Sequence, residues 1–216
     1  MNAIDATRWV LNFFEFGAVV AGLLSWKKIK HTYWQWLLVY LIIVLVNEMA
    51  GKYLNHIHLS GINQQLYRYT APIRFVLLLH VLMKPLGMRI RNIAKLMFAL
   101  YIMLFLAEQF VLPVSYFKTS MLSLFIGYVT LLVLCMAYLV KLIQSDAILH
   151  FQTDMHFWLS VGLLLFYVIF MPFHTARTSL NNHYPDVFLM YWYVQMGAAC
   201  IMYVCFTILF VWGKPS

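Results

Sequence analysis

The chain has 216 residues, of which 64% are hydrophobic and only 10% are charged, and its mean hydropathy is +0.81. A soluble domain carries about 25% charged residues, so this composition excludes a water-facing globular surface. The net charge is +8, and most of the basic residues lie in short loops beside apolar runs. This pattern is typical of membrane topology signals and argues against a nucleic-acid-binding protein.

Seven apolar stretches predict seven transmembrane helices joined by short loops. In chain order they cover residues 9–26, 32–50, 66–83, 93–112, 121–141, 155–174 and 187–212. The third stretch is the weakest, because Arg74 interrupts it and Pro72 lies in its first turns. We therefore expect an all-α, polytopic membrane protein in which residues 1–216 form a single seven-helix transmembrane domain.

The loop charges orient these helices, because Lys and Arg concentrate on the cytoplasmic side of a membrane protein. The more basic side carries Lys27, Lys28, Lys30, Lys84, Arg89, Arg91, Lys95, Lys141 and Lys214. The other side carries Arg8, Lys52, Arg68, Lys118 and Arg177. The sequence thus predicts that the N-terminus lies outside and the C-terminus in the cytoplasm, in the inner (plasma) membrane of a bacterium.

Polar side chains inside the spans gather in the outer half of the predicted bundle. The members of this layer are Asn12, Glu15, Asn47, Glu48, Arg74, Glu108, His174 and Gln195. At 1.5 Å per residue, Glu15 lies roughly 10 Å and Arg74 about 12 Å below the outer ends of their spans. Charge is expensive in lipid, so the layer predicts a ligand-binding site, or else buried residues that only brace the helices.

Arg74 cannot lose its proton, so it is expected to pair with at least one of three carboxylates at matching depth. These are the side chains of Glu15, Glu48 and Glu108. The two remaining acids would be protonated, paired with another basic group, hydrated, or in contact with a cationic ligand.

Several familiar motifs for catalysis or cofactor binding are absent from the sequence. The last span has no Lys for a retinal Schiff base, and HExxH, GxSxG and P-loop signatures do not occur. Four histidines near the outer ends of the spans are weak candidates for a zinc site: His56, His58, His174 and His183. We predict no metal and no cofactor, assign no catalytic residue, and leave enzyme activity open, with a non-enzymatic function favoured.

The lipid bilayer is the main predicted partner, and two segments suggest others. The basic run Lys84, Arg89, Arg91 and Lys95 favours a cytoplasmic signalling partner or anionic lipid. The small residues Gly17, Ala18 and Gly22 permit close helix approach, either within the chain or in a homodimer.

One resemblance covers several parts of the chain. Asn47-Glu48, the N-Q-Q-L-Y stretch 63–67, the Y-T-A-P-I-R-F stretch 69–75, Glu108 and Gln195 form a pattern similar to bacterial seven-helix integral membrane proteins of about this length. This chain differs in having Arg74 where the pattern has an acid or amide, and one extra residue before Pro72. The resemblance implies a seven-helix fold and favours sensing, without a transferable activity.

Three functions fit these observations. A one-sided polar layer favours a receptor-like or signalling module with an outward-facing polar pocket. A transporter or channel for a small solute or ion needs polar residues on both sides of the midplane. An intramembrane metal- or carboxylate-dependent hydrolase needs a metal, nucleophile or activated water near a Glu or His.

Overall fold

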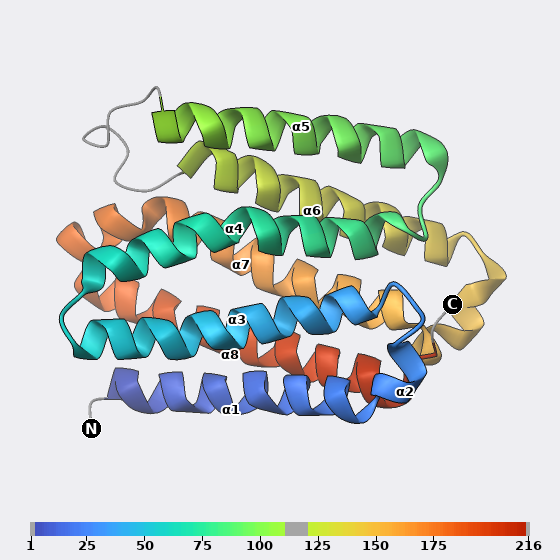
Figure 1. The fold of residues 1–216 in the computed structure, drawn as a ribbon, viewed down its shortest axis with the longest axis horizontal. Helices are drawn as coiled ribbons and strands as arrows, with labels where there is room; N and C mark the ends of the chain where they lie inside the picture. Colours follow the sequence, from blue (N-terminus) through green and yellow to red (C-terminus); the bar gives the residue numbers. More distant parts are fainter. Residues whose placement is uncertain (1–2, 111–120, 215–216) are drawn as a thin grey trace. The chain divides into compact units, whose positions relative to one another are not determined.

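The computed structural model describes residues 3–110 and 121–214, and these residues are almost entirely helical (Figure 1). Seven of the described helices have 22 residues or more. They are α1 (Ala3–Leu24), α3 (Gln35–His56), α4 (Ser60–Met83), α5 (Met88–Phe110), α6 (Met121–Ile143), α7 (Met155–His183) and α8 (Pro185–Trp212). The short helix α2 (Trp26–Ile29) follows α1, and the 3₁₀ helix η1 (Asp146–Thr153) precedes α7.

Six of the long helices are apolar enough to cross a membrane. The crossing segments are Thr7–Leu24, Gln35–His56, Met88–Phe110, Leu122–Ile143, Met155–Arg177 and Pro185–Trp212. They make the chain compatible with a multi-pass integral membrane protein. The helix α4 has 24 residues but includes Arg68 and Arg74, so a seventh crossing and the orientation of the bundle stay predictions. Lys118 and the predicted end of the fourth span at Leu112 lie outside the described residues.

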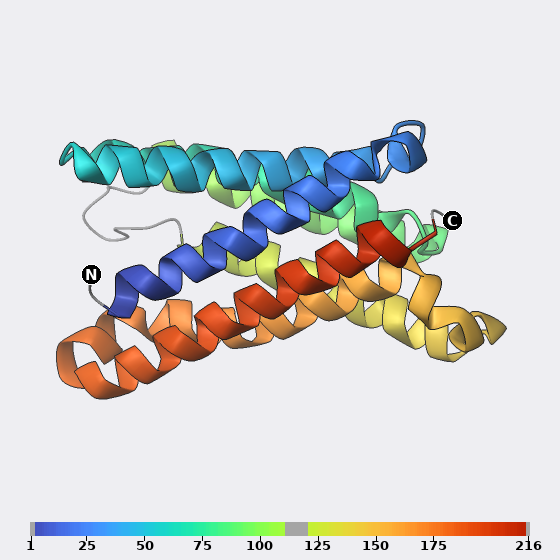
Figure 2. The same ribbon diagram turned by 90° about the horizontal axis from the view of Figure 1, so that it is seen from below.

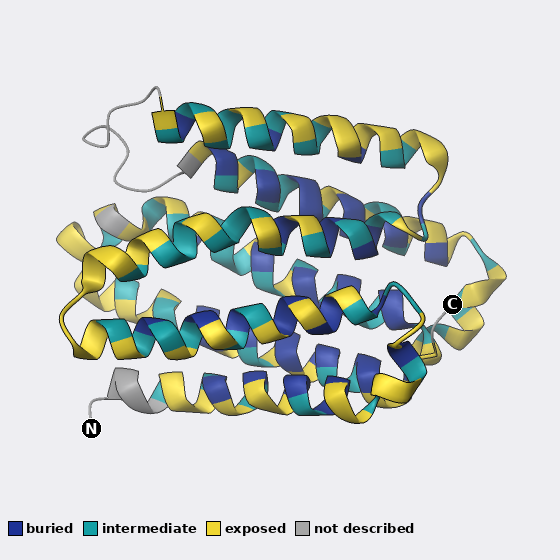
Figure 3. Cartoon of the chain, viewed as in Figure 1, coloured by how far each residue is buried: buried dark blue, intermediate teal, exposed yellow. Residues whose placement is uncertain are grey.

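Large apolar side chains are exposed along these helices, as lipid contact requires. Phe13 is 74%, Leu24 82% and Phe110 84% exposed. In α5 only Ala94, Tyr101 and Glu108 are buried, and the other residues of this helix are exposed or partly exposed (Figure 3). Water-soluble proteins rarely leave continuous apolar surface of this kind uncovered.

The chain divides into two compact units, and the boundary between them falls inside α6. Unit 1 consists of Met1–Ile29 and Cys135–Ser216, and unit 2 of Lys30–Leu134. In unit 1, α8 packs against both α1 and α7 (Figure 2). In unit 2, α3 packs against α4, and α4 packs against α5.

Small residues explain how closely the helices of unit 1 approach. A Cβ atom added at Gly162 of α7 would lie 3.0 Å from Cys205 Cβ and 3.4 Å from the Met202 carbonyl oxygen, both on α8. On α1, Ala18 and Gly22 are buried while Gly17 is exposed. The burial of Ala18 and Gly22 agrees with packing inside the chain, the first of the two interpretations of this segment.

The end of α8 is bound by side chains from the α1–α2 junction. Ser25 Oγ donates to the Phe210 carbonyl oxygen at 2.9 Å, and Lys28 Nζ donates to the same oxygen at 3.0 Å. The last carbonyls of a helix have no partner within it, so these two donors complete α8. Burial lowers the pKa of the Lys28 ammonium group from its ordinary value.

The close contact at Gly162 predicts a position-specific loss of stability. We expect Gly162→Leu to lower the free energy of unfolding by about 1–3 kcal/mol, because the new side chain overlaps α8. The control Gly197→Leu places the same side chain where a Cβ meets nothing within 4 Å, and should change stability by less than about 0.5 kcal/mol. Thermal unfolding of the detergent-purified variants measures both. Equal melting temperatures would contradict the packing described here.

Candidate functional site

A series of polar contacts joins α3 and α4 in unit 2. Asn47 Nδ2 donates to Thr70 Oγ1 at 2.8 Å, and the Tyr67 hydroxyl donates to Glu48 Oε1 at 2.8 Å. Because the two helices are antiparallel, residues later on α3 meet residues earlier on α4. Asn47 is only 3% exposed, so its amide depends on this partner rather than on water.

Gly51 allows α4 to come close enough to α3 for these contacts. A Cβ atom at Gly51 would lie 2.8 Å from Asn63 Oδ1 and 3.1 Å from the Tyr67 hydroxyl oxygen. The approach of a helix to a buried glycine is common in membrane bundles, where small residues let backbones draw together. Gly51 therefore positions Tyr67 beside Glu48.

Arg74 lies on the same side of α4 as Tyr67, two turns further along. Its Nη2 atom donates to the Tyr67 carbonyl oxygen at 3.4 Å, and its Cζ atom is 5.8 Å from the centre of the Tyr67 ring. The Tyr67 hydroxyl is bound to Glu48, so one tyrosine contacts both charged groups. The contact with the ring is a cation–π interaction, a favourable arrangement for a guanidinium in an apolar setting.

Within unit 2, Arg74 contacts Tyr67 and does not form the expected ion pair directly with a carboxylate. No described carboxylate of unit 2 lies within 4.0 Å of its guanidinium, and its buried Nε atom has no hydrogen-bond partner among the described residues of that unit. Tyr67 stands between Arg74 and Glu48 instead. Glu15 belongs to unit 1, so its pairing with Arg74 stays a prediction.

Glu108 of α5 binds the beginning of α6. Its Oε1 atom accepts from the backbone N–H groups of Leu122 at 2.9 Å and Ser123 at 3.0 Å, and its Oε2 atom accepts from Ser123 Oγ at 2.5 Å. The first N–H groups of a helix have no partner inside it and carry partial positive charge, which a carboxylate neutralises. Arg68 Nη2 donates to the Glu108 carbonyl oxygen at 3.2 Å. Glu108 thus links three helices of unit 2.

The remaining members of the predicted layer lie in unit 1. Glu15 and Asn12 are buried on α1 at 0% and 6% exposure, and Gln195 is buried on α8 at 8%. The His174 ring on α7 stacks on Phe170, with 5.2 Å between ring centres. The structure therefore brings Asn47, Glu48 and Arg74 close together through Tyr67 and Thr70, and holds Glu108 at a separate helix junction.

The histidines considered for zinc belong to different units: His56 and His58 to unit 2, His174 and His183 to unit 1. His56 and His58 are exposed at the turn between α3 and α4, and His183 is exposed at the end of α7. In residues 3–110 and 121–214, no three side chains of His, Cys, Asp or Glu come together as a metal site requires.

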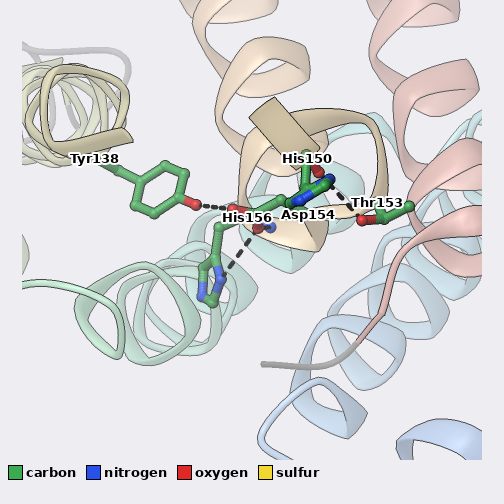
Figure 4. Close-up of polar contacts among 5 residues, drawn as sticks. All are labelled: Tyr138, His150, Thr153, Asp154 and His156. Carbon is green, nitrogen blue, oxygen red and sulfur yellow. Dashed lines mark hydrogen bonds and ion pairs between the residues drawn. The ribbon is translucent and has the colours of Figure 1, made fainter. Parts of the chain in front are cut away.

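A second polar cluster, missed by the sequence analysis, lies at the start of α7 (Figure 4). The Tyr138 hydroxyl of α6 donates to Asp154 Oδ2. Asp154 Oδ1 accepts from the His156 backbone N–H at 2.8 Å, and His156 Nδ1 lies 3.9 Å from the same oxygen. Asp154 directly precedes an apolar run, which is a helix N-cap signal that could have identified it. Nothing in the sequence indicates that Tyr138 meets it.

The C-terminal segment also reaches this cluster. The Lys214 backbone N–H donates to the Thr153 carbonyl oxygen at 2.7 Å, and Thr153 Oγ1 donates to the His150 carbonyl oxygen at 3.1 Å. Tyr138 and His156 are 5% and 1% exposed. The cluster therefore binds α6, η1, the start of α7 and the end of the chain within unit 1.

In a comparison with known proteins, no family model, curated protein or solved structure matches the chain. The functional argument depends on the residues themselves.

The contacts of Glu108 predict that it stabilises unit 2. We expect Glu108→Ala to lower the free energy of unfolding by about 2–3 kcal/mol, because the buried N–H groups of α6 lose a charged acceptor. Ser123→Ala removes one of the three hydrogen bonds and should cost about 1 kcal/mol. Thermal unfolding of both variants gives the comparison, and the interpretation fails if Ser123→Ala is the more damaging change.

The Tyr138 contact can be tested in the same way. Tyr138→Phe deletes a buried hydrogen bond to a carboxylate and should cost about 2 kcal/mol. The matched control is Tyr193→Phe on α8, whose side chain is 43% exposed, and it should leave the melting temperature unchanged. A Tyr138→Phe variant as stable as the wild type would show that Asp154 does not depend on this hydroxyl.

Proposed function

We propose that the chain is a receptor-like or signalling membrane protein. In this proposal residues 1–216 form one seven-helix transmembrane domain, with the N-terminus outside and the C-terminus in the cytoplasm. Its binding site opens to the outside and is built on Arg74, Tyr67 and Glu48. Apart from the cluster of Tyr138, Asp154 and His156, the polar residues of the spans gather in the predicted outer half. This distribution supports a site that holds a ligand over a path that passes one.

The observation that carries this proposal is the incomplete pairing of Arg74. Its guanidinium lies on a helix of a largely apolar chain. No described carboxylate of unit 2 lies within 4.0 Å of it, and its buried Nε atom lacks a hydrogen-bond partner among the described residues of that unit. A purely structural arginine in lipid would be expected to have its charge and its donors satisfied. An ionisable residue kept inside a membrane protein without such satisfaction indicates function.

A signalling role also needs a surface on the cytoplasmic side. Lys84, Arg89 and Lys95 are exposed around the turn between α4 and α5, and Arg91 is partly exposed beside them. In the proposed orientation these residues face the cytoplasm. They support contact with anionic lipid headgroups or with an acidic signalling partner.

Cysteine accessibility tests the proposed site. In a background with Cys135, Cys200 and Cys205 replaced by Ala, we expect Glu48→Cys and Arg74→Cys to react with a membrane-impermeant methanethiosulfonate added from outside. The same reagent added to inverted vesicles should not modify them. Leu78→Cys is the matched control, because Leu78 lies four residues beyond Arg74 on α4 and is 1% exposed.

The outcomes separate the functions considered. Modification from both sides would favour a transporter that exposes the site alternately. Modification from neither side would mean a sealed structural cluster and would contradict the proposal. Ser60→Cys and Gln144→Cys, at exposed positions, report the orientation, since the first should react only from outside and the second only from the cytoplasmic side.

A further inference from the structure

Three helix termini lie at one end of unit 2, and basic side chains surround them. Helix α3 begins at Gln35, α4 ends at Met83 and α5 begins at Met88, and α4 packs against both α3 and α5 (Figure 1). Lys84 Nζ lies 5.9 Å from the centre of the Tyr33 ring, so the turn after α4 contacts the turn before α3. The basic end of unit 2 consists of side chains that are exposed or partly exposed: Lys30, Lys84, Arg89, Arg91 and Lys95.

The acidic side chains of unit 2 lie far from this basic end. Residues 30–134 contain two of them, Glu48 and Glu108. At 1.5 Å per residue, Glu48 lies roughly 20 Å along α3 from its start, and Glu108 about 30 Å along α5 from its start. Surface charges are screened over about 8–10 Å in physiological salt. These two carboxylates therefore do not offset the positive potential of the basic end, and this potential attracts anions.

Helix stability does not explain the arginines of α5. Arg89 and Arg91 lie in its first turn, which contains no acidic residue. The N–H groups at the start of a helix carry partial positive charge, so cations are unfavourable there. Lys84 differs from them, because it follows the end of α4, where a cation is favourable. An anion beside Arg89 and Arg91 would offset their repulsion by the helix.

Exposed apolar side chains continue from the basic end along α5. Arg89, Ile93 and Leu96 stand at i, i+4 and i+7, so they share one face of the helix. Ile93 is 52% and Leu96 70% exposed, and they lie roughly 6 and 10 Å beyond Arg89 along the helix axis. This face presents a cation first and apolar side chains after it. A phospholipid has the matching order, with an anionic headgroup followed by acyl chains, whereas an acidic segment of a soluble protein does not.

We propose that the basic end of unit 2 binds the headgroup of an anionic phospholipid whose acyl chains lie along α5. Guanidinium and ammonium groups donate to the phosphate oxygens, and Ile93 and Leu96 contact the chains. The inference rests on the proposed function for its orientation, because the basic end then faces the cytoplasmic leaflet, where anionic lipids attract basic segments. It assigns the cytoplasmic surface to lipid rather than to an acidic protein.

Thermal unfolding of the purified full-length chain in neutral detergent, with added lipid, tests this partner. Phosphatidylglycerol is the probe, phosphatidylcholine with the same acyl chains is the control without net charge, and poly-glutamate represents an acidic protein. We expect phosphatidylglycerol to raise the melting temperature in a concentration-dependent way, and about 1 M salt to remove most of this effect. Phosphatidylcholine and poly-glutamate should have little effect.

Two results of this experiment would overturn the proposal. Equal shifts by the two lipids would mean that the basic residues act as topology signals and do not select an anionic headgroup. A shift by poly-glutamate without one by phosphatidylglycerol would assign the surface to an acidic protein.

Matched double variants locate the binding surface. Arg89→Gln/Lys95→Gln should weaken phosphatidylglycerol binding about 25-fold, at about 5-fold for each basic residue. The control Arg177→Gln/Lys214→Gln removes the same charge at exposed positions of unit 1 and should leave the affinity unchanged. If the first variant does not fold, Lys84→Gln is expected to weaken binding about 5-fold. Equal weakening in both double variants, or unchanged affinity in the folded variants of the basic end, would overturn the assignment.

Failure of this inference and failure of the proposed function give different results. Cysteine modification at positions 48 and 74 from outside only, without any effect of phosphatidylglycerol, would leave the outward-facing site in place and discard the lipid surface. Phosphatidylglycerol binding that depends on the basic end, with Gln144→Cys reacting from outside, would keep the lipid surface and discard the proposed orientation.

Discussion

Unit 2 is organised around one charge that cannot be removed. Arg74 stays protonated in any protein environment, so a helix that carries it through an apolar chain needs partners for it. Tyr67 provides its ring and its carbonyl oxygen, and its hydroxyl extends the contact to Glu48. Gly51 is the residue that lets α4 come near enough to α3 for this arrangement. The partners of this one side chain thus depend on how closely two helices pack.

The carboxylates of unit 2 bind groups other than the arginine: Glu48 accepts from a tyrosine on the facing helix, and Glu108 accepts from a helix N-terminus. Glu108 completes the first turn of α6, where backbone N–H groups carry partial positive charge. Asp154 has the same role at α7 in unit 1. Loop charges, span length and depth could not distinguish this use of an acid from an ion pair. A helix N-terminus and an arginine attract a carboxylate for related electrostatic reasons.

The helices themselves were largely predictable, because an apolar stretch of membrane length is a strong signal. The stretch 32–50 corresponds to Gln35–His56, and 187–212 to Pro185–Trp212. The stretch 155–174 corresponds to the crossing segment Met155–Arg177, and α7 itself continues past Pro172 to His183. The contacts between side chains of different helices were not predictable. The rotation of each helix about its axis decides that Tyr67 contacts Glu48 and that Tyr138 contacts Asp154, and sequence spacing does not give this rotation. The short η1 segment lacks any apolar periodicity long enough to detect.

The bond from Ser25 to Phe210 joins residues 185 positions apart, and α1 finds its packing partner in α8. Unit 2, in contrast, is built from one continuous stretch of chain. Helix α1 is therefore synthesised long before the helix that covers it, while α3, α4 and α5 meet their partners almost at once. Contacts so distant in sequence form slowly. All of unit 2 can therefore be present before α8 has been made, whereas the α1–α8 contact of unit 1 cannot form until then.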